Sequence, residues 1–218
     1  MVQKENTPPA AAKPAAEPKR RGRPRAYAPE VALGQALALF RKGGFAATSL
    51  DDLSAATGMN RPSLYGAFGD KRELYIKAYR RYRDDYGAQL VDIFKADLGL
   101  RQRLARIFNV ALETYLSGGD APRGCFTVMT VASDAIADPD VRALAQDSVV
   151  GLDKAFARCF RIAAEKYELP KSADIATLSQ IATATLFSLA IRARAGTPRP
   201  QLEAIVQGAI DLLCRDAV

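Results

Sequence analysis

The chain has 218 residues, a net charge of +7 and no histidine. Apolar residues make up 49% of the sequence, enough for a real hydrophobic core in one or two compact domains. Without histidine, a glycine-rich phosphate loop or a cluster of metal ligands, the sequence argues against an enzyme, a metal site and a bound cofactor.

Targeting signals are missing from the sequence. No apolar run approaches the roughly 18 residues that a membrane span requires, and residues 1–18 lack the apolar segment of a secretory signal. Cys125, Cys159 and Cys214 show neither metal-ligand spacing nor an even disulfide framework. These features predict a reduced, cytoplasmic protein without a membrane partner.

Residues 1–25 form a basic arm. Seven Lys and Arg side chains against two Glu give this segment a net charge of +5, which leaves +2 for the rest. Pro, Ala and charged residues dominate it without a hydrophobic period, so we expect it to be disordered when free. Such an arm suggests an anionic partner, although a merely solvated tail has the same composition.

The arm contains the sequence RGRP, which is the centre of an AT-hook. Gly22 and Pro24 keep the chain extended and thin enough for the minor groove of DNA. Arg21, Arg23 and Arg25 would be attracted by the negative potential of a narrow A·T groove. The motif is short, but it lies directly before a predicted DNA-binding unit.

The helical pattern begins at Pro29. Apolar residues at positions 33, 36, 37 and 40 follow one face of a helix that the pair Gly43-Gly44 should end. A second helix should begin at Ser49, whose spacing to Asp52 is close to a capping box. Residues 49–75 then read SLDDLSAATGMNRPSLYGAFGDKRELY.

This stretch has the layout of a helix-turn-helix motif. Gly58 can adopt the left-handed conformation that the tight turn requires. Asn60 is a favourable N-cap for a third helix, and Pro62 is tolerated in that helix's first turn. In such motifs the second helix enters the DNA major groove, so the sequence predicts a DNA-binding protein.

The rest of the chain also has helical periodicity. Asp70 and Glu73 form another cap pair, which should start a long helix at about Lys71 that continues to about Phe94. No segment alternates like a strand, so we expect an all-α fold without internal repeats. Further helices are predicted at about 100–117, 124–135, 138–167, 172–195 and 199–215.

The run from Pro29 to Tyr75 resembles the TetR family of bacterial transcriptional regulators. The resemblance rests on ALALFRKGGFAATSLDDLS, on the turn GMNRPSLY and on FGDKREL. It implies a DNA-binding domain at residues 26–75 after the arm at 1–25, and a helical ligand-binding and dimerisation domain at 76–218. It also implies a nucleoid-associated homodimer that represses transcription and is released from a palindromic DNA operator by a small apolar effector.

The third helix supplies the candidates for reading DNA bases. Arg61 can pair with guanine O6 and N7 through its guanidinium group. Pro62 can contact a thymine methyl group, and Ser63 can donate to a base or a phosphate. Family members often have an aromatic residue or His where this chain has Gly66 and Ala67, so one phosphate donor is missing.

Phosphate contacts are expected beside these bases. Thr48 and Lys71 lie at helix starts, where the helix dipole favours anions. Tyr65 would reach a phosphate through its hydroxyl, as the family's Tyr does, because Leu64 and Phe68 already supply the packing face.

Aromatic and long apolar side chains of the C-terminal part are candidates for an effector cavity, although simple core is the more common role for most of them. They are Phe108, Tyr115, Phe126, Met129, Phe156, Phe160 and Phe187. The last two helices are the dimerisation candidates, since pairing two helices from each subunit gives a four-helix bundle.

Two alternatives use the same sequence differently. Cys125 follows Arg123 closely, and that charge could favour a thiolate, so the protein could be a redox or electrophile sensor on the same scaffold. The AT-hook alone could make it a non-specific architectural DNA-binding protein, but this does not explain the long helical region after Tyr75.

Overall fold

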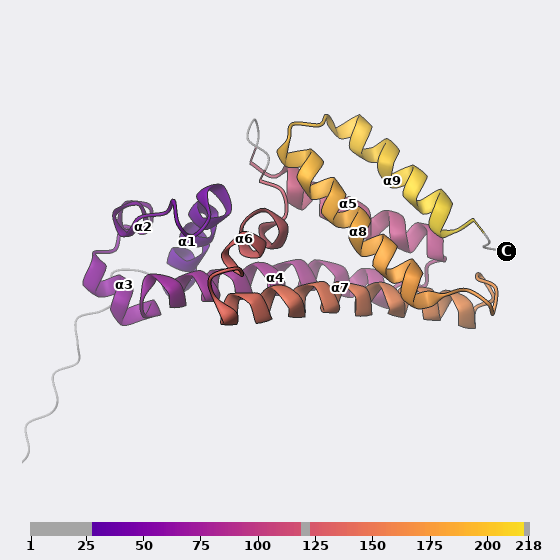
Figure 1. Cartoon of the computed structure of the whole chain (residues 1–218), viewed down its shortest axis with the longest axis horizontal. Coiled ribbons are helices and arrows are strands. Elements are labelled where there is room, and N and C mark those ends of the chain that lie inside the picture. Colours follow the sequence, from indigo (N-terminus) through magenta and orange to yellow (C-terminus); the bar gives the residue numbers. More distant parts are fainter. Residues whose placement is uncertain (1–27, 119–122, 216–218) are drawn as a thin grey trace, which may run out of the picture.

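The computed structural model describes residues 28–118 and 123–215, and all regular elements in these ranges are helical (Figure 1). The all-α prediction is therefore confirmed, and most predicted helix ends agree within a few residues. The elements are α1 Pro29–Gly43, α2 Leu50–Thr57, α3 Arg61–Phe68, α4 Lys71–Lys95, α5 Leu100–Leu116, a π-helix η1 Thr127–Val131, α6 Ala132–Asp134, α7 Pro139–Glu165, α8 Ile175–Arg194 and α9 Arg199–Leu213.

Side-chain caps define the short helices of the N-terminal unit. Ser49 and Asp52 form a reciprocal capping box at the start of α2, where the Ser49 hydroxyl accepts from the Asp52 N–H at 3.0 Å. Gly58 ends α2 in the left-handed conformation, with φ of 65°. The Asn60 side chain then accepts from the Ser63 N–H at 2.9 Å and starts α3.

A small apolar core joins α1, α2, α3 and the start of α4. Leu53, Met59, Leu64 and Phe68 are all buried. Phe40 of α1 is also buried, and its ring contacts the Tyr75 ring edge to face at 5.0 Å between centroids. These contacts fix α3 relative to the helices behind it.

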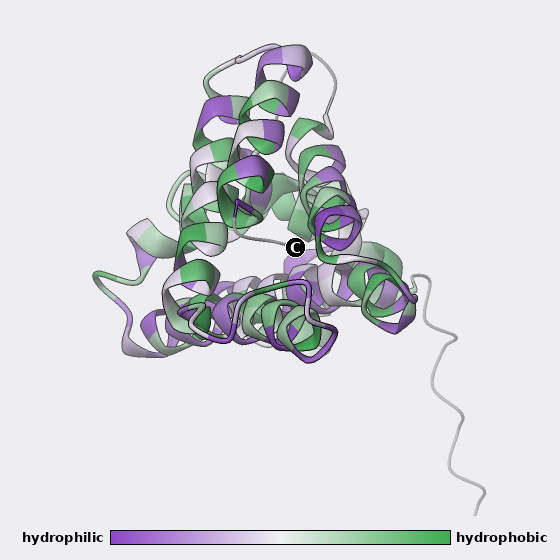
Figure 2. Cartoon of the chain, turned by 90° about the vertical axis from the view of Figure 1, so that its right-hand side faces the viewer, coloured by the Kyte–Doolittle hydropathy of each residue, from purple (hydrophilic) through white to green (hydrophobic). Residues whose placement is uncertain are grey.

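Helix α4 belongs to both parts of the molecule. It begins with an Asp70–Glu73 capping box beside α3, continues without a break past residue 75 and runs alongside α7 (Figure 1). Helices α5, α8 and α9 complete the larger part of the molecule. Apolar and polar residues mix along these helices, as expected for amphipathic helices that share one core (Figure 2).

The helix predicted at 124–135 is wrong in detail. Residues Thr127–Val131 form a π-helix, and only Ala132–Asp134 are α-helical. Gly124 has φ of 64°, and a Cβ there would lie 2.9 Å from the Ala190 carbonyl oxygen. This close approach to α8, which only glycine permits, keeps residue 124 out of a regular helix.

Among the described helices, Ile175–Arg194 is long and apolar enough to cross a membrane by length and hydropathy alone. The expectation that no apolar run approaches that length therefore needs this correction. In the structure, α8 packs against α5, α7 and α9, as a core helix of the bundle does.

Candidate nucleic-acid interface and effector cavity

Helix α3 presents one side to solvent and the other to the core. Leu64 and Phe68 are 2% and 5% exposed, whereas Tyr65 between them is 45% exposed. Arg61 and Pro62 in the first turn are also exposed, and Ser63 is half-buried. Because the packing residues face inward, the side chains predicted to read DNA lie on the outer surface of the unit.

Arg61 forms an ion pair that the sequence analysis missed. Its Nη2 atom lies 2.7 Å from Asp51 Oδ1, in the first turn of α2, and the carboxylate raises the pKa of Arg61. Both side chains are largely exposed, so the pair contributes little to stability. Its consequence is geometric: Asp51 limits where the guanidinium can point.

Thr48 does not have the position expected of a phosphate contact. Its side chain is 3% exposed, and its hydroxyl donates to the Gly44 carbonyl oxygen at 2.8 Å. The hydroxyl proton is therefore used in closing the loop between α1 and α2. The structure gives no support to the predicted phosphate contact by this side chain, and the exposed Ser49 beside it is the cap of α2.

Lys71 is the first residue of α4, as expected. Its ammonium group lies 4.3 Å from the centre of the Phe45 ring, a cation–π contact that orients the side chain without neutralising it. Gly66, where family members often carry a larger side chain, has open space around its Cβ position. Arg21, Arg23 and Arg25 lie outside the described residues.

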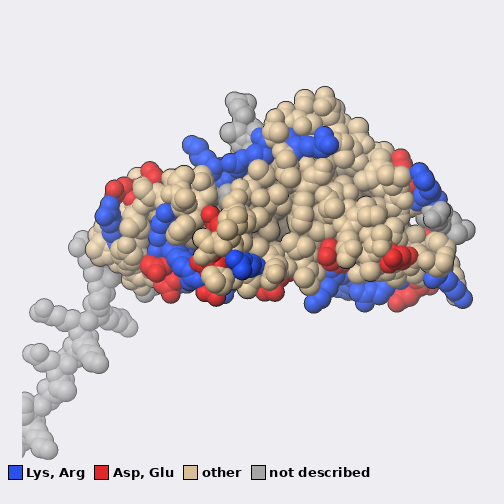
Figure 3. All heavy atoms as spheres, in the orientation of Figure 1, with Lys and Arg blue, Asp and Glu red and all other residues tan. Residues whose placement is uncertain are grey.

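The charge of the described surface is mixed. On the face in Figure 3, acidic side chains accompany Lys and Arg around the α1–α4 end of the molecule. This agrees with the net charge of +2 outside the basic arm. Recognition by this unit would therefore depend on a few placed side chains rather than on a uniformly positive surface.

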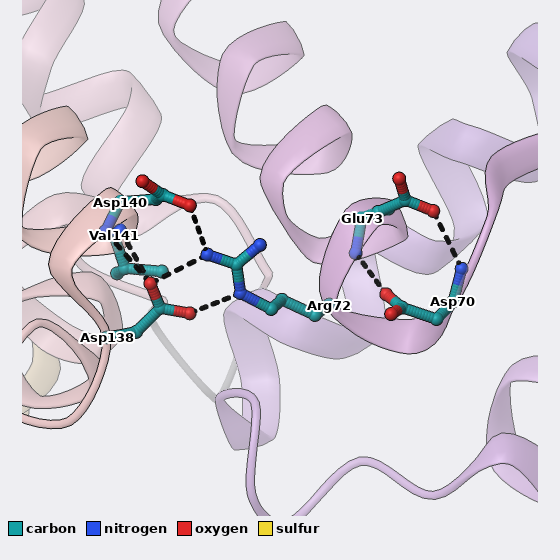
Figure 4. Close-up of polar contacts among 6 residues, drawn as sticks. All are labelled: Asp70, Arg72, Glu73, Asp138, Asp140 and Val141. Carbon is teal, nitrogen blue, oxygen red and sulfur yellow. Dashed lines mark hydrogen bonds and ion pairs between the residues drawn. The ribbon is translucent and has the colours of Figure 1, made fainter.

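Arginine side chains make two of the sets of contacts that connect the N-terminal unit to the larger part. At the first, Arg72 near the start of α4 binds Asp138 and Asp140 at the start of α7, with N–O distances of 2.5 Å to each (Figure 4). Asp138 also caps α7 by accepting from the backbone N–H groups of Asp140 and Val141. The Arg72 guanidinium holds the pKa of Asp138 well below its usual range.

The second connection lies at the end of α1. Arg41 Nη2 donates to the carbonyl oxygens of Thr114 and Gly124, at 3.1 and 3.3 Å. In the opposite direction, Arg194 Nη1 donates to the carbonyl oxygens of Arg41 and Arg123, at 3.2 and 3.0 Å. Helices α1 and α4 are thus both attached to the larger part through charge-assisted hydrogen bonds.

A cavity of about 520 Å³ lies in the larger part, between α4 and α7. This volume suits a small organic molecule. Residues of α5 and of the segment around Cys125 complete its wall. The lining residues are Tyr82, Arg83, Tyr86, Gly87, Leu90, Phe94, Tyr115, Cys125, Thr127, Asp147, Ser148, Val150, Gly151, Leu152, Lys154 and Ala155.

Of the seven side chains predicted to line an effector site, Tyr115 alone lines this cavity. Phe126 contacts the rings of Tyr75, Tyr79 and Tyr82 edge to face, and Phe108 packs against Phe156. The prediction for the other six residues is corrected, because none of them lines this cavity. Five pack in or against the core: Phe108, Phe126, Phe156, Phe160 and Phe187. Met129 is half-buried beside Gly124.

The missed lining residues come mainly from α4 and α7, where Tyr82, Tyr86 and Leu90 already showed helical spacing in the sequence. That spacing alone could not identify them, because an internal core and a cavity wall have the same apolar period. Mid-helix glycines at positions 87 and 151 were an available signal.

Cys125 is the cysteine that lines the cavity, and it is 6% exposed. The Tyr82 hydroxyl donates to its Sγ atom at 3.6 Å. Cys159 is buried elsewhere, and desolvation raises its pKa to about 11. Burial also raises the pKa of Cys214. Of the three thiols, therefore, the cavity gives only Cys125 a place beside a bound molecule.

The apolar faces of α8 and α9 divide into an inner and an outer part. One apolar face of α9 is turned inward, since Leu202, Val206, Ile210 and Leu213 are buried within the chain. A second apolar strip remains exposed. It includes Ile181, Ala184 and Ile191 of α8 and Ala204 and Leu212 of α9.

Comparisons with known proteins give a consistent picture. The family model "Bacterial regulatory proteins, tetR family" matches residues 32–78. A second, "Tetracyclin repressor-like, C-terminal domain", matches residues 101–210, which is half of the chain.

Two curated relatives of this chain are transcriptional repressors. The repressor BdcR of Escherichia coli K12 is 34% identical over 124 residues, which cover 57% of this chain and 61% of BdcR, so the match spans about three fifths of that relative. The repressor ComR of the same strain is 27% identical over 185 residues, covering 84% of this chain and 88% of ComR.

A solved structure of the TetR family regulator CifR, a cysteine mutant in complex with 26-bp operator DNA, superimposes with a TM-score of 0.78. Its sequence is 26% identical, and the match covers 87% of this chain and 98% of that one. The relatives are regulators, in agreement with the prediction that the chain is not an enzyme. The chain belongs to the TetR family of bacterial transcriptional regulators.

Proposed function

We propose that this regulator is a repressor that binds a palindromic operator as a homodimer in the bacterial cytoplasm, in association with the nucleoid, and is released by a small effector. The observation that carries the proposal is the outer face of α3, where Arg61, Pro62 and Tyr65 are exposed while their neighbours hold the helix in the core. In a helix-turn-helix these are the positions that meet DNA.

Each exposed group has a proposed role on the operator. Arg61 pairs with a guanine edge, Pro62 contacts a thymine methyl group, and Ser63 donates to a base or phosphate. Tyr65 and Lys71 contact the phosphates on either side. The similar regulator CifR was solved with operator DNA, which supports DNA binding by this unit.

The basic arm supplies a further contact in this proposal. Arg21, Arg23 and Arg25 enter an A·T minor groove beside the major-groove site. Deleting residues 1–25 should then weaken operator binding and reduce the slope of log affinity against log salt concentration, because fewer counterions are released. Equal affinity and slope for the full and shortened chains would remove the arm from the proposal.

The exposed apolar strip on α8 and α9 supports a homodimer. Ile181 and Ile191 are 48% and 52% exposed, and Leu212 is 61% exposed, on adjacent helices at the end of the chain. A twofold axis through such a strip buries it in a four-helix bundle and separates two α3 helices. The palindromic operator follows, since half-sites about 34–36 Å apart must match that separation.

The proposed switch uses α4, which lines the cavity and continues into the DNA-binding unit. A ligand between α4 and α7 can change operator affinity only if it binds the displaced arrangement better than the DNA-competent one. The contacts of Arg72 with the start of α7 would transmit a change in the α4–α7 spacing to the region of Lys71 and α3.

The test is selection of bound fragments from the genome of the source organism by the purified full chain. We expect a small set of fragments that share an inverted repeat, and weaker binding of an Arg61→Ala variant to each of them. A collection of unrelated A·T-rich fragments, bound equally by wild type and variant, would favour the non-specific architectural alternative instead.

One observation supports a second candidate function, that of a redox or electrophile sensor: Cys125 lines the cavity. A thiol at that position can react with a molecule that the cavity admits. Treating the protein with an alkylating agent should then reduce operator binding, while Cys125→Ser stays bound after the same treatment. Unchanged binding of the treated wild type would exclude this candidate.

A further inference from the structure

Most of the buried hydroxyl groups that line the cavity have hydrogen-bond partners. The hydroxyls of Thr127 and Ser148, which line the cavity, lie 3.0 and 2.6 Å from the Tyr79 hydroxyl. The Tyr82 hydroxyl donates to Cys125 Sγ. These groups already have hydrogen-bond partners, so they offer a ligand few free donors or acceptors.

The Tyr86 hydroxyl is different. It is buried, and no group among the described residues forms a hydrogen bond with it. Tyr86 lines the cavity, and burial, followed by the neighbouring Cys125, raises its pKa. The phenol therefore stays protonated at neutral pH and remains a donor. A buried donor without an acceptor is costly. The hydroxyl has almost no exposed surface, so a ligand in the cavity can supply the acceptor only when the Tyr86 side chain turns toward it.

Two glycines open the same cavity. Gly87 lies in the middle of α4 and Gly151 in the middle of α7, and both line it. A Cβ at either position would meet no atom within 4 Å. Glycine inside a helix is less stable than alanine, so two of them facing one cavity favour an accessible space over helix stability.

The other lining residues indicate the shape and polarity of a suitable ligand. Aromatic rings of Tyr82, Phe94 and Tyr115 and the aliphatic Leu90 and Leu152 suit a flat apolar body. The charged lining residues provide no buried charge, because Asp147 and Lys154 are exposed and Arg83 is half-buried. A neutral molecule therefore fits this wall better than an ion.

We propose that the cavity binds neutral aromatic carbonyl compounds, whose ring lies against the aromatic wall and whose carbonyl oxygen accepts a hydrogen bond from Tyr86. This inference rests on the proposed function only in calling the compound an effector. Binding itself can be tested without DNA, so the two can fail separately.

The test compares two fluorescent probes in the full chain: prodan, an aromatic ketone, and N-phenylnaphthylamine, which has similar size but no carbonyl group. Tyr86→Phe should weaken prodan binding about 3- to 10-fold, the range for one hydrogen bond, and leave N-phenylnaphthylamine binding unchanged. Tyr167→Phe, at an exposed tyrosine, is the matched control and should change neither. Tyr86→Phe should not lower the melting temperature, since the hydroxyl it removes has no partner.

A second variant and a ligand pair keep the test independent of that substitution. Gly151→Leu should prevent binding of both probes, whereas Gly151→Ala should not. In the wild type, acetonaphthone should displace prodan more strongly than ethylnaphthalene, which has the same skeleton without the carbonyl oxygen. Equal effects of Tyr86→Phe on both probes, equal competition by this pair, or no prodan binding to the wild type would each overturn the inference. Loss of operator binding alone would instead count against the proposed function.

Discussion

The N-terminal unit is tightly packed, whereas the larger helical part contains a cavity. In the N-terminal unit, short helices begin at Ser49 and Asn60, whose side chains cap them, and Leu53 and Leu64 are fully packed. In the larger part, the long helices α4 and α7 leave a cavity of about 520 Å³ between them.

This difference indicates which part of the molecule is rigid and which part can adapt. A recognition helix must be held in one orientation to read bases, and capping side chains together with a packed core can hold it there. The proposed ligand site must admit a molecule, which agrees with an open space, two helix-interior glycines and a Tyr86 hydroxyl that has no partner among the described residues. Helix α4 passes through both regions.

The largest expected effect comes from opening a void in the rigid unit. Leu53→Ala removes a side chain that is fully buried between the short helices, which should cost about 2–5 kcal/mol of unfolding free energy. Urea denaturation measures this loss. Leu50→Ala, at a half-buried position on the same helix, is the control and should cost clearly less. Similar losses for both would show that the unit is less tightly packed than described.

Removing the proposed base contact should be next in size. Arg61→Ala is expected to weaken binding to the selected operator about 10- to 100-fold, while non-specific DNA loses far less. Fluorescence anisotropy at matched salt measures both. A uniform loss on both kinds of DNA would make Arg61 a phosphate contact rather than a base reader.

Asp51→Asn separates the position of Arg61 from its charge. The change removes the carboxylate beside the guanidinium but keeps Arg61 itself. We expect non-specific DNA binding to strengthen, because a negative charge is lost, and discrimination between operator and random DNA to fall. Unaltered discrimination would show that Asp51 does not orient Arg61 on DNA.

A cap should have a smaller effect than a core residue. Ser49→Ala removes the side-chain acceptor for the Asp52 N–H at the start of α2 and should cost about 1 kcal/mol. Ser49→Asn, which preserves an uncharged N-cap acceptor beside the Asp52 carboxylate, should recover most of the loss in thermal denaturation. A full-size loss in both variants would mean that the hydroxyl has a role other than capping.

The smallest effect on stability should come from the connection between the two regions. Asp138→Asn retains an N-cap for α7 but weakens the ion pair with Arg72. We expect a nearly unchanged melting temperature and an altered response of operator binding to a cavity ligand. Because the pKa of Asp138 is lowered in the folded chain, its contribution is present above the ordinary carboxyl pKa. As pH falls through the lowered value this contribution is lost, so wild type and variant should converge in acid.

Much of the fold was predictable because its determinants are local. Ser49, Gly58 and Asn60 specify two helices and their turn through their own side chains and backbone, and the apolar period specifies α4. The irregular segment after Gly124 was not predictable, because its shape depends on contact with α8, far along the chain.

The two candidate sites also differ in how much of each the sequence could predict. Tyr65 was placed correctly on the outer face of α3, since its neighbours had the packing period. Most of the cavity wall was not predicted, because residue type alone does not show which helices leave a space between them. Thr48 and the Asp51–Arg61 pair also depended on tertiary geometry that residue type does not reveal.

The central claim is that two α3 helices, held in one dimer, bind two half-sites at a fixed separation. The most direct measurement compares binding to the selected inverted repeat with binding to the same repeat after insertion of about five base pairs, half a turn of DNA, at its centre. We predict at least a tenfold loss of affinity with the insertion, because the second half-site then faces away from its helix. Equal affinity for the two DNAs would contradict the claim.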